Sequence, residues 1–333
     1  MIKFQFITGL LLLLLISNSR AQEKKAINNS YIAFTIPEKD LLPENVAFDP
    51  QTESFFVGST RKGKVLRVKD GKIEEFIKPK AHGLWMTIGM KVDSQRRILW
   101  VNSSGGSNLE GYTKKDDVDG RPAGVFKFNL DTGELIQKYT METKGEVHFL
   151  NDLVVARNGD VYVTHTFGEP AIYKIANGSD ELELFVKDEI IMYPNGITIA
   201  DNQRVLFVAH AEGLARIDIP DKKVTALSVP EGVKVSRRES MDGLYYYKWS
   251  LIGMQSDLAT INRYYLNDEG DGIDRVEVVE KNHPMMDYPT TGAIIGSTFY
   301  YIANSQFPRI SDDGVLIPMD QLYEPVVLKV ELE

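Results

Sequence analysis

The chain contains no cysteine among its 333 residues. It therefore has no disulfide, no zinc site built from thiolates and no cysteine nucleophile. Apolar residues seldom recur at helical spacing, so long amphipathic helices are not expected. There is no Gly-rich phosphate loop and no Gly-x-Ser-x-Gly elbow, which argues against nucleotide-phosphate binding and serine-hydrolase chemistry.

Basic clusters are missing as well. The formal net charge is −9 at pH 7, and no stretch of the chain gathers lysine and arginine. Nucleic acid and anionic membrane surfaces are therefore not expected as partners, because both attract basic proteins. A small-molecule substrate is the expected partner, and the sequence does not indicate an oligomeric state.

Long apolar runs are confined to the N-terminus. The run Ile7–Ile16 contains six consecutive leucines, follows Lys3, and precedes the small-residue pattern Ser19-Arg20-Ala21. This pattern predicts a signal peptide over residues 1–21, with export to the periplasm or the medium. An uncleaved membrane anchor is the alternative, although the run is short for a bilayer span. Residues 22–30 are polar and predict a flexible leader.

The rest of the chain repeats with a period of about 49 residues, which lies within the range of propeller blades. Each repeat has a small polar motif and a short apolar strand, then a turn and a stronger apolar strand. The repeats open near Glu44, Gly89, Asn151, Asn195, Asp242 and Thr291. We therefore predict an all-β, six-bladed propeller over residues 31–333. Strands at 31–36 and 326–332 would share the last blade and close the ring. Two β-sandwich domains are the alternative fold.

The opening residues of the repeats should ring one mouth of the central channel. Four of them carry a side-chain oxygen that is suited to a metal: Glu44, Asn151, Asn195 and Asp242. Two carboxylates and two amides suit a hard divalent cation, and calcium fits better than zinc. Each Asn-Asp, Asn-Gly or Asp-Gly pair alone is an ordinary turn dipeptide. Their common position in the repeat favours an axial metal site.

Four stretches resemble the motifs of the senescence-marker-protein, gluconolactonase and luciferin-regenerating-enzyme family, which is related to paraoxonase and diisopropyl fluorophosphatase. They are Pro43–Pro50, Phe149–Asp152, Tyr193–Ile197 and Met241–Leu244. The resemblance implies a six-bladed propeller with an axial calcium, held by Glu44, Asn151, Asn195 and Asp242. It also implies hydrolysis of lactones or organophosphates, with Asp242 as a candidate base. Asn45 departs from the family pattern, in which a glycine often follows the glutamate.

Further candidates lie near the same mouth. Second strands return to it, so His165 and His210 at their ends could orient a substrate or move a proton. Asp152 follows Asn151 directly, and we expect it to support the metal from behind more than to bind it. The predicted catalytic residues are Asp242, Asp152, His165 and His210. The polar insert from Ser103 to Ala123 should lie on this face as a lid or as a solvated loop.

The sequence therefore predicts a calcium-dependent hydrolase of a lactone or related ester, in which another divalent cation could replace calcium. The alternatives are a phosphotriester hydrolase at the same site, and a non-catalytic propeller in which the metal pins the ring and a sugar or small molecule binds. An open coordination position on the metal would separate the enzymes from the binding protein.

Overall fold

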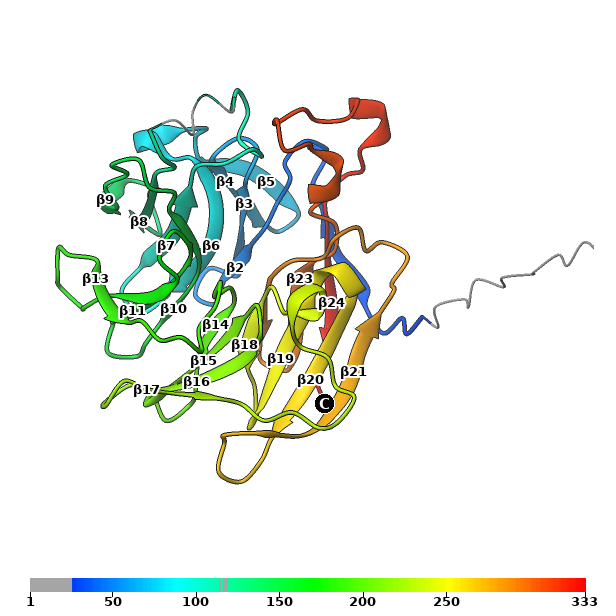
Figure 1. The fold of residues 1–333 in the computed structure, drawn as a ribbon. Coiled ribbons are helices and arrows are strands. Elements are labelled where there is room, and N and C mark those ends of the chain that lie inside the picture. Colours follow the sequence, from blue (N-terminus) through cyan, green and yellow to red (C-terminus); the bar gives the residue numbers. More distant parts are fainter. Residues whose placement is uncertain (1–25, 114, 116–118) are drawn as a thin grey trace, which may run out of the picture.

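Each predicted repeat forms an antiparallel sheet of four strands. The computed structural model describes residues 26–113, 115 and 119–333. The predicted signal peptide, residues 1–21, lies outside the described residues. Six four-stranded sheets are arranged as blades around a central axis (Figure 1), which confirms the six-bladed propeller. From blade 1 to blade 5, the first strand of each blade contacts that of the next along this axis, and the first strands of blades 6 and 1 are also in contact.

The strands follow the chain from blade to blade. Blade 1 has β2 (Val46–Asp49), β3 (Ser54–Ser59), β4 (Lys64–Lys69) and β5 (Lys72–Ile77); blade 2 has β6 (Met86–Asp93), β7 (Ile98–Ser104), β8 (Ala123–Asn129) and β9 (Leu135–Thr140). Blade 3 has β10 (Phe149–Val155), β11 (Val161–Phe167), β12 (Ala171–Ile175) and β13 (Glu183–Val186); blade 4 has β14 (Ile197–Ile199), β15 (Val205–His210), β16 (Gly213–Asp218) and β17 (Lys223–Ala226). Blade 5 has β18 (Leu244–Tyr246), β19 (Ser250–Gln255), β20 (Thr260–Leu266) and β21 (Ile273–Lys281).

Blade 6 closes the ring with strands from both ends of the described chain. Its order is β22 (Gly292–Ile295), β23 (Thr298–Ile302), β24 (Val326–Glu331) and β1 (Tyr31–Thr35), so the first strand of the chain pairs with the last. The sequence predicted this pairing, and the structure confirms it. Part of the expected leader is attached to blade 5, because Ile27 bridges to Lys281 and the backbone N–H groups of Asn29 and Ser30 donate to Glu280.

The apolar core lies between the blades. The described residues form six buried apolar clusters, one at each contact between neighbouring blades. Phe56 of blade 1, for example, packs in one cluster with Met90 and Phe126 of blade 2. Because both faces of a blade are covered, the second strands β7, β15 and β19 are buried at every position. This explains why they read as continuous apolar runs rather than alternating ones.

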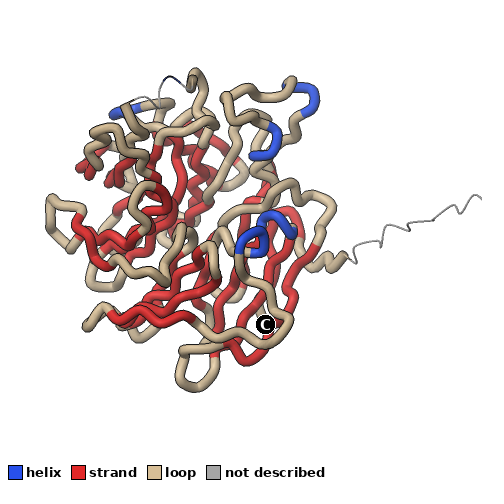
Figure 2. The backbone as a smooth tube through the Cα atoms, in the orientation of Figure 1, coloured by secondary structure: helices blue, strands red, loops and turns tan. Residues whose placement is uncertain are grey.

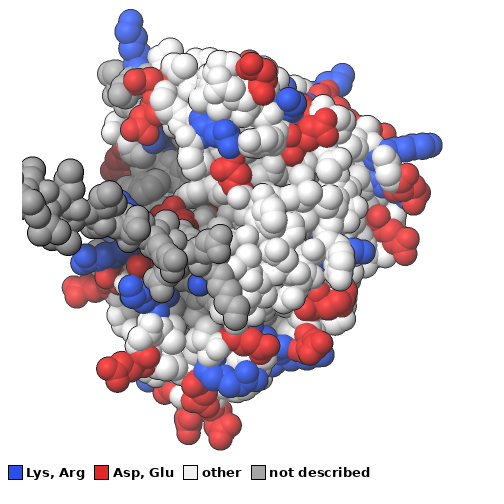
Figure 3. Space-filling model, turned by 90° about the vertical axis from the view of Figure 1, so that its right-hand side faces the viewer, with Lys and Arg blue, Asp and Glu red and all other residues white. Residues whose placement is uncertain are grey.

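Outside the strands, the described residues form loops and short 3-10 turns (Figure 2). No helix among the described residues is long and apolar enough to cross a membrane. On the face shown in Figure 3, acidic and basic side chains are interspersed over the surface.

Candidate functional site

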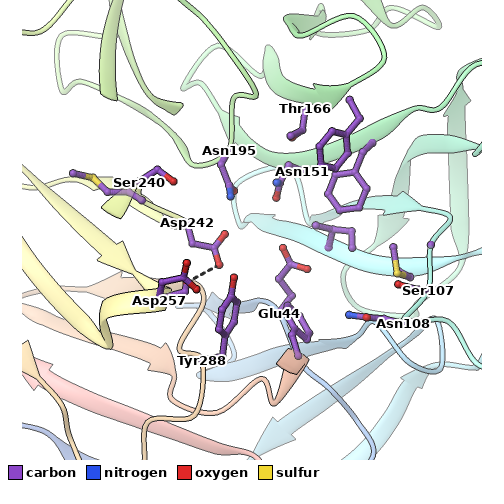
Figure 4. A pocket seen from close by; sticks show the side chains of 18 of the residues that line it. Glu44, Ser107, Asn108, Asn151, Thr166, Asn195, Ser240, Asp242, Asp257 and Tyr288 are labelled. Atoms are coloured by element: carbon purple, nitrogen blue, oxygen red, sulfur yellow. Dashed lines mark hydrogen bonds between the residues drawn. The ribbon is translucent and has the colours of Figure 1, made fainter. Parts of the chain in front are cut away.

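A cavity of about 350 Å³ opens at one mouth of the channel. Glu44, Asn151, Asn195 and Asp242 all line it, and they come from four different blades. Figure 4 shows their four side chains pointing towards a common space. The repeat register therefore brings the four predicted ligands together at one end of the channel.

Burial makes this space unfavourable for two free carboxylates. Burial, followed by the nearby charges of Asp242 and Asp152, raises the pKa of Glu44 well above its usual value. Burial also raises the pKa of Asp242 to about 6, although the side chains of Ser256 and Asn195 oppose this by hydrogen bonding. The Ser256 hydroxyl donates to Asp242 Oδ2 at 3.1 Å (Figure 4). A bound cation would relieve this unfavourable burial of negative charge.

One of the four side chains has an oxygen without a partner. The Asn195 Oδ1 atom is buried and accepts no hydrogen bond from the described residues. Such an orphan acceptor is uncommon in folded proteins and fits a missing cation or water. Within the described residues, no group of three or more His, Cys, Asp or Glu side chains is placed to hold a metal. The four converging side chains contain only two carboxylates, and the other two are amides.

Neighbouring blades hold the backbones of these residues in place. The hydroxyls of Thr290 and Thr291 donate to the Glu44 carbonyl at 2.7 and 2.6 Å. In the same way, Asn102 Nδ2 donates to the Asn151 carbonyl at 3.0 Å, and Thr164 Oγ1 donates to the Asn195 carbonyl at 2.8 Å. Blade 6 thus uses its repeat-opening Thr291 to fix Glu44.

Gly89, which opens the repeat of blade 2, has a steric role. A Cβ atom at Gly89 would lie 2.4 Å from the Asn151 carbonyl oxygen and 2.8 Å from the Asp152 Cα atom. No side chain fits there without moving the backbone that carries Asn151. At this position blade 2 therefore contributes a close contact between its backbone and that of blade 3, instead of a side chain that could bind a metal.

Asp152 lies behind the pocket and does not line it. Its Oδ1 atom accepts hydrogen bonds from Lys91 Nζ at 3.0 Å and from the Leu153 N–H at 2.9 Å. Its Oδ2 atom accepts a hydrogen bond from the Ile197 N–H at 3.4 Å. The side chain is nearly fully buried and ties blade 2 to blades 3 and 4. This placement favours a supporting role, and a catalytic role for Asp152 stays a prediction.

Neither predicted histidine lines the pocket. His165 lies with its Nε2 atom 3.0 Å from His148 Nδ1 and its Nδ1 atom 2.7 Å from the Glu169 carbonyl oxygen. The His210 Nδ1 atom accepts a hydrogen bond from the Glu212 N–H at 3.3 Å, and its Nε2 atom is buried without a hydrogen-bond partner among the described residues. Burial lowers the pKa of both rings, which favours their neutral forms. Their part in catalysis stays a prediction.

The sequence missed the residues that do flank the four side chains. Thr166, Ser256 and Asp257 line the pocket, and they lie one or two positions after His165 and Gln255. Side chains alternate between faces along a strand, so an error of one residue selects the wrong face. Gln255, at the end of the second strand of blade 5, donates from Nε2 to the Lys234 carbonyl at 3.0 Å and anchors the loop before Asp242.

The rim of the pocket comes from several blades. Ser107 and Asn108 of the long insert in blade 2 line it, on the face where the sequence placed this insert. Phe149 and the 42% exposed Phe167 form one side, with ring centroids 5.5 Å apart. Arg237 and Arg238 lie on the rim as well. The mouth therefore offers aromatic, polar and cationic contacts to a small molecule.

The fold of this chain was compared with those of known proteins. No protein-family model and no curated protein sequence matches the chain. Solved structures do. The calcium-binding protein regucalcin from Agrobacterium tumefaciens matches 91% of this chain over 96% of its own, at a TM-score of 0.59 and 17% identity. A gluconolactonase from Xanthomonas campestris matches 93% of this chain over 98% of its own, at a TM-score of 0.57 and 12% sequence identity.

The chain shares the fold of these proteins. The resemblance that the sequence motifs indicated is confirmed at the level of the six-bladed propeller. The Malassezia sympodialis allergen Mala s 1 also matches, over 92% of this chain and 97% of its own, at a TM-score of 0.68 and 14% identity. At such identities the likeness concerns the fold, because unrelated functions share propellers.

Proposed function

We propose that this protein is a calcium-dependent hydrolase of lactones or related esters. The observation that carries the proposal is the convergence of Glu44, Asn151, Asn195 and Asp242 on one pocket, where the buried Asn195 Oδ1 atom has no partner in the described part of the chain. Two carboxylates and two amide oxygens match the ligands that calcium prefers. The gluconolactonase and regucalcin with the same fold support this choice of chemistry.

The four side chains would hold the ion at the floor of the pocket. A calcium ion bound there would polarise a substrate carbonyl and stabilise the oxyanion that forms in the transition state. Asp242 faces the pocket, so its carboxylate would accept the proton of the attacking water. The aromatic, polar and cationic groups of the rim would orient the substrate above it. Of the four predicted catalytic residues, Asp242 is the one that lines this pocket.

The proposal is tested by calorimetry and by hydrolysis assays on the same preparation. Calcium should bind to the wild-type protein and raise its Tm. Hydrolysis of δ-gluconolactone, γ-butyrolactone or 4-nitrophenyl acetate should require calcium and stop on addition of a chelator. Asp242→Asn should abolish hydrolysis and weaken calcium binding, whereas Asp320→Asn, an exposed aspartate outside the pocket, should change neither.

The results would also separate the alternatives. If a phosphotriester were hydrolysed and no lactone were, the site would belong to the phosphotriester hydrolase. Calcium binding without hydrolysis of any ester would indicate the non-catalytic propeller. Absence of calcium binding, together with a Tm that a chelator does not change, would rule out the metal site.

A further inference from the structure

Tyr288 brings a phenol hydroxyl to the pocket from the segment that precedes β22. Figure 4 shows its ring standing between Asp257 and Glu44, with the hydroxyl end directed towards the space that Asp242 and Glu44 face. No repeat motif points to this residue, because it lies three positions before Thr291, outside the first strand of blade 6.

The backbone at Tyr288 is held in an unusual conformation. Its φ angle is 63°, in the left-handed region that bulky side chains rarely adopt. The neighbouring structure imposes this conformation: Ser305 Oγ donates to the Tyr288 carbonyl at 2.7 Å, and the Asp287 N–H donates to the Ala303 carbonyl at 3.0 Å. Arg309 Nε also donates to Asp287 Oδ2 at 2.6 Å. Strain that the surroundings maintain in this way is typical of functional positions.

The hydroxyl has no partner in the described part of the chain. Other hydroxyls near the pocket are engaged: the Ser256 hydroxyl donates to Asp242, and the hydroxyls of Thr290 and Thr291 donate to the backbone carbonyl of Glu44. Tyr288 is half-buried and lines the pocket, and its phenol makes no hydrogen bond to any other described residue. A phenol keeps its proton up to a pH of about 10. Tyr288 is therefore a donor that faces the pocket and is available to an oxygen of a bound substrate.

We propose that Tyr288 is a catalytic hydrogen-bond donor whose O–H stabilises the substrate oxygen on which negative charge develops during ester cleavage. This inference rests on the proposed hydrolase function. Water forms a bond to the carbonyl carbon and gives one proton to Asp242. The ester C–O bond then breaks, the leaving oxygen takes that proton, and the hydroxy acid is released. Tyr288 donates a hydrogen bond throughout and keeps its own proton.

The deciding variant is Tyr288→Phe, which removes only the hydroxyl. Loss of one such donor is expected to lower kcat about 100-fold, with a smaller change in KM. Tm and calcium affinity should equal those of the wild type, because the hydroxyl has no partner within the described residues. The matched control is Tyr31→Phe, since Tyr31 is 74% exposed on β1 and does not line the pocket. It should keep the wild-type kcat.

Two results would overturn the proposal while the wild type remains active. One is a Tyr288→Phe protein with an unchanged kcat. The other is a Tyr288→Phe protein in which a lower kcat comes with weaker calcium binding or a lower Tm, because loss of the ion or of the fold would then explain the lower kcat. If the wild type hydrolysed no ester, the proposed function would fail. The catalytic role of Tyr288 would then fail with it, whereas an active wild type whose Tyr288→Phe variant keeps the wild-type kcat would refute the role of Tyr288 alone.

Discussion

At the scale of single residues, Asp242 couples folding to pH. Its pKa of about 6 in the folded, metal-free protein lies above the ordinary value of 3.8. The folded state therefore binds more protons than the unfolded state between these values, and the free energy of unfolding falls as pH rises from 4 to 6. We predict that, in chelator, Asp242→Asn loses less stability over this window than the wild type. The difference should be on the order of 2 kcal/mol, since one pKa unit corresponds to about 1.4 kcal/mol.

Urea unfolding at several pH values measures this difference. Glu44 has a raised pKa as well, so part of the slope should remain in the variant. Asp320→Asn provides the control, because this exposed aspartate lies outside the pocket and should leave the slope unchanged. Equal slopes for wild type and Asp242→Asn would contradict the prediction.

At the scale of the elements, the ion pair between Lys91 on β6 and Asp152 on β10 links blades 2 and 3. Lys91 Nζ lies 3.0 Å from Asp152 Oδ1, and the aspartate side chain is only 2% exposed. Removing the lysine would leave a buried carboxylate without its counter-ion. We predict that Lys91→Met lowers the free energy of unfolding by about 3 kcal/mol.

The double variant Lys91→Met/Asp152→Asn should recover part of that loss, because its buried group is neutral. Chemical unfolding of the two single variants and the double variant measures the coupling. Lys69→Met, on the exposed end of β4, should change stability little. Additive losses in the double variant would show that the pair does not act as a unit.

At the scale of the whole molecule, one strand closes the ring. β1 pairs with β24, and Phe34 and Ile36 belong to the apolar cluster between blades 6 and 1. We predict that a chain beginning at Ile36 has a lower Tm and a greater tendency to associate than a chain beginning at Ser30, because the edge of β24 becomes exposed. Calorimetry and light scattering compare the two chains. An identical Tm would mean that closure by β1 contributes nothing to stability.

The sequence by itself determined the architecture and the register of the pocket. Six repeats that share one opening motif predict six blades, and the position of Glu44, Asn151, Asn195 and Asp242 in the repeat predicts that they meet at one mouth. Both follow from local patterns, since each blade has the same strand order and the first strand always lines the channel. Calcium at this mouth stays a prediction.

The tertiary structure alone decided which other side chains reach the pocket. The position at the end of a second strand made His165 a candidate, but Thr166 lines the cavity, because a shift of one residue reverses the face. Tyr288 reaches it from a loop and Asp257 from the short 3-10 turn Ser256–Leu258, and the course of such segments depends on contacts with other parts of the chain. Sequence patterns describe regular elements, whereas irregular segments take their shape from neighbours that are distant in the chain.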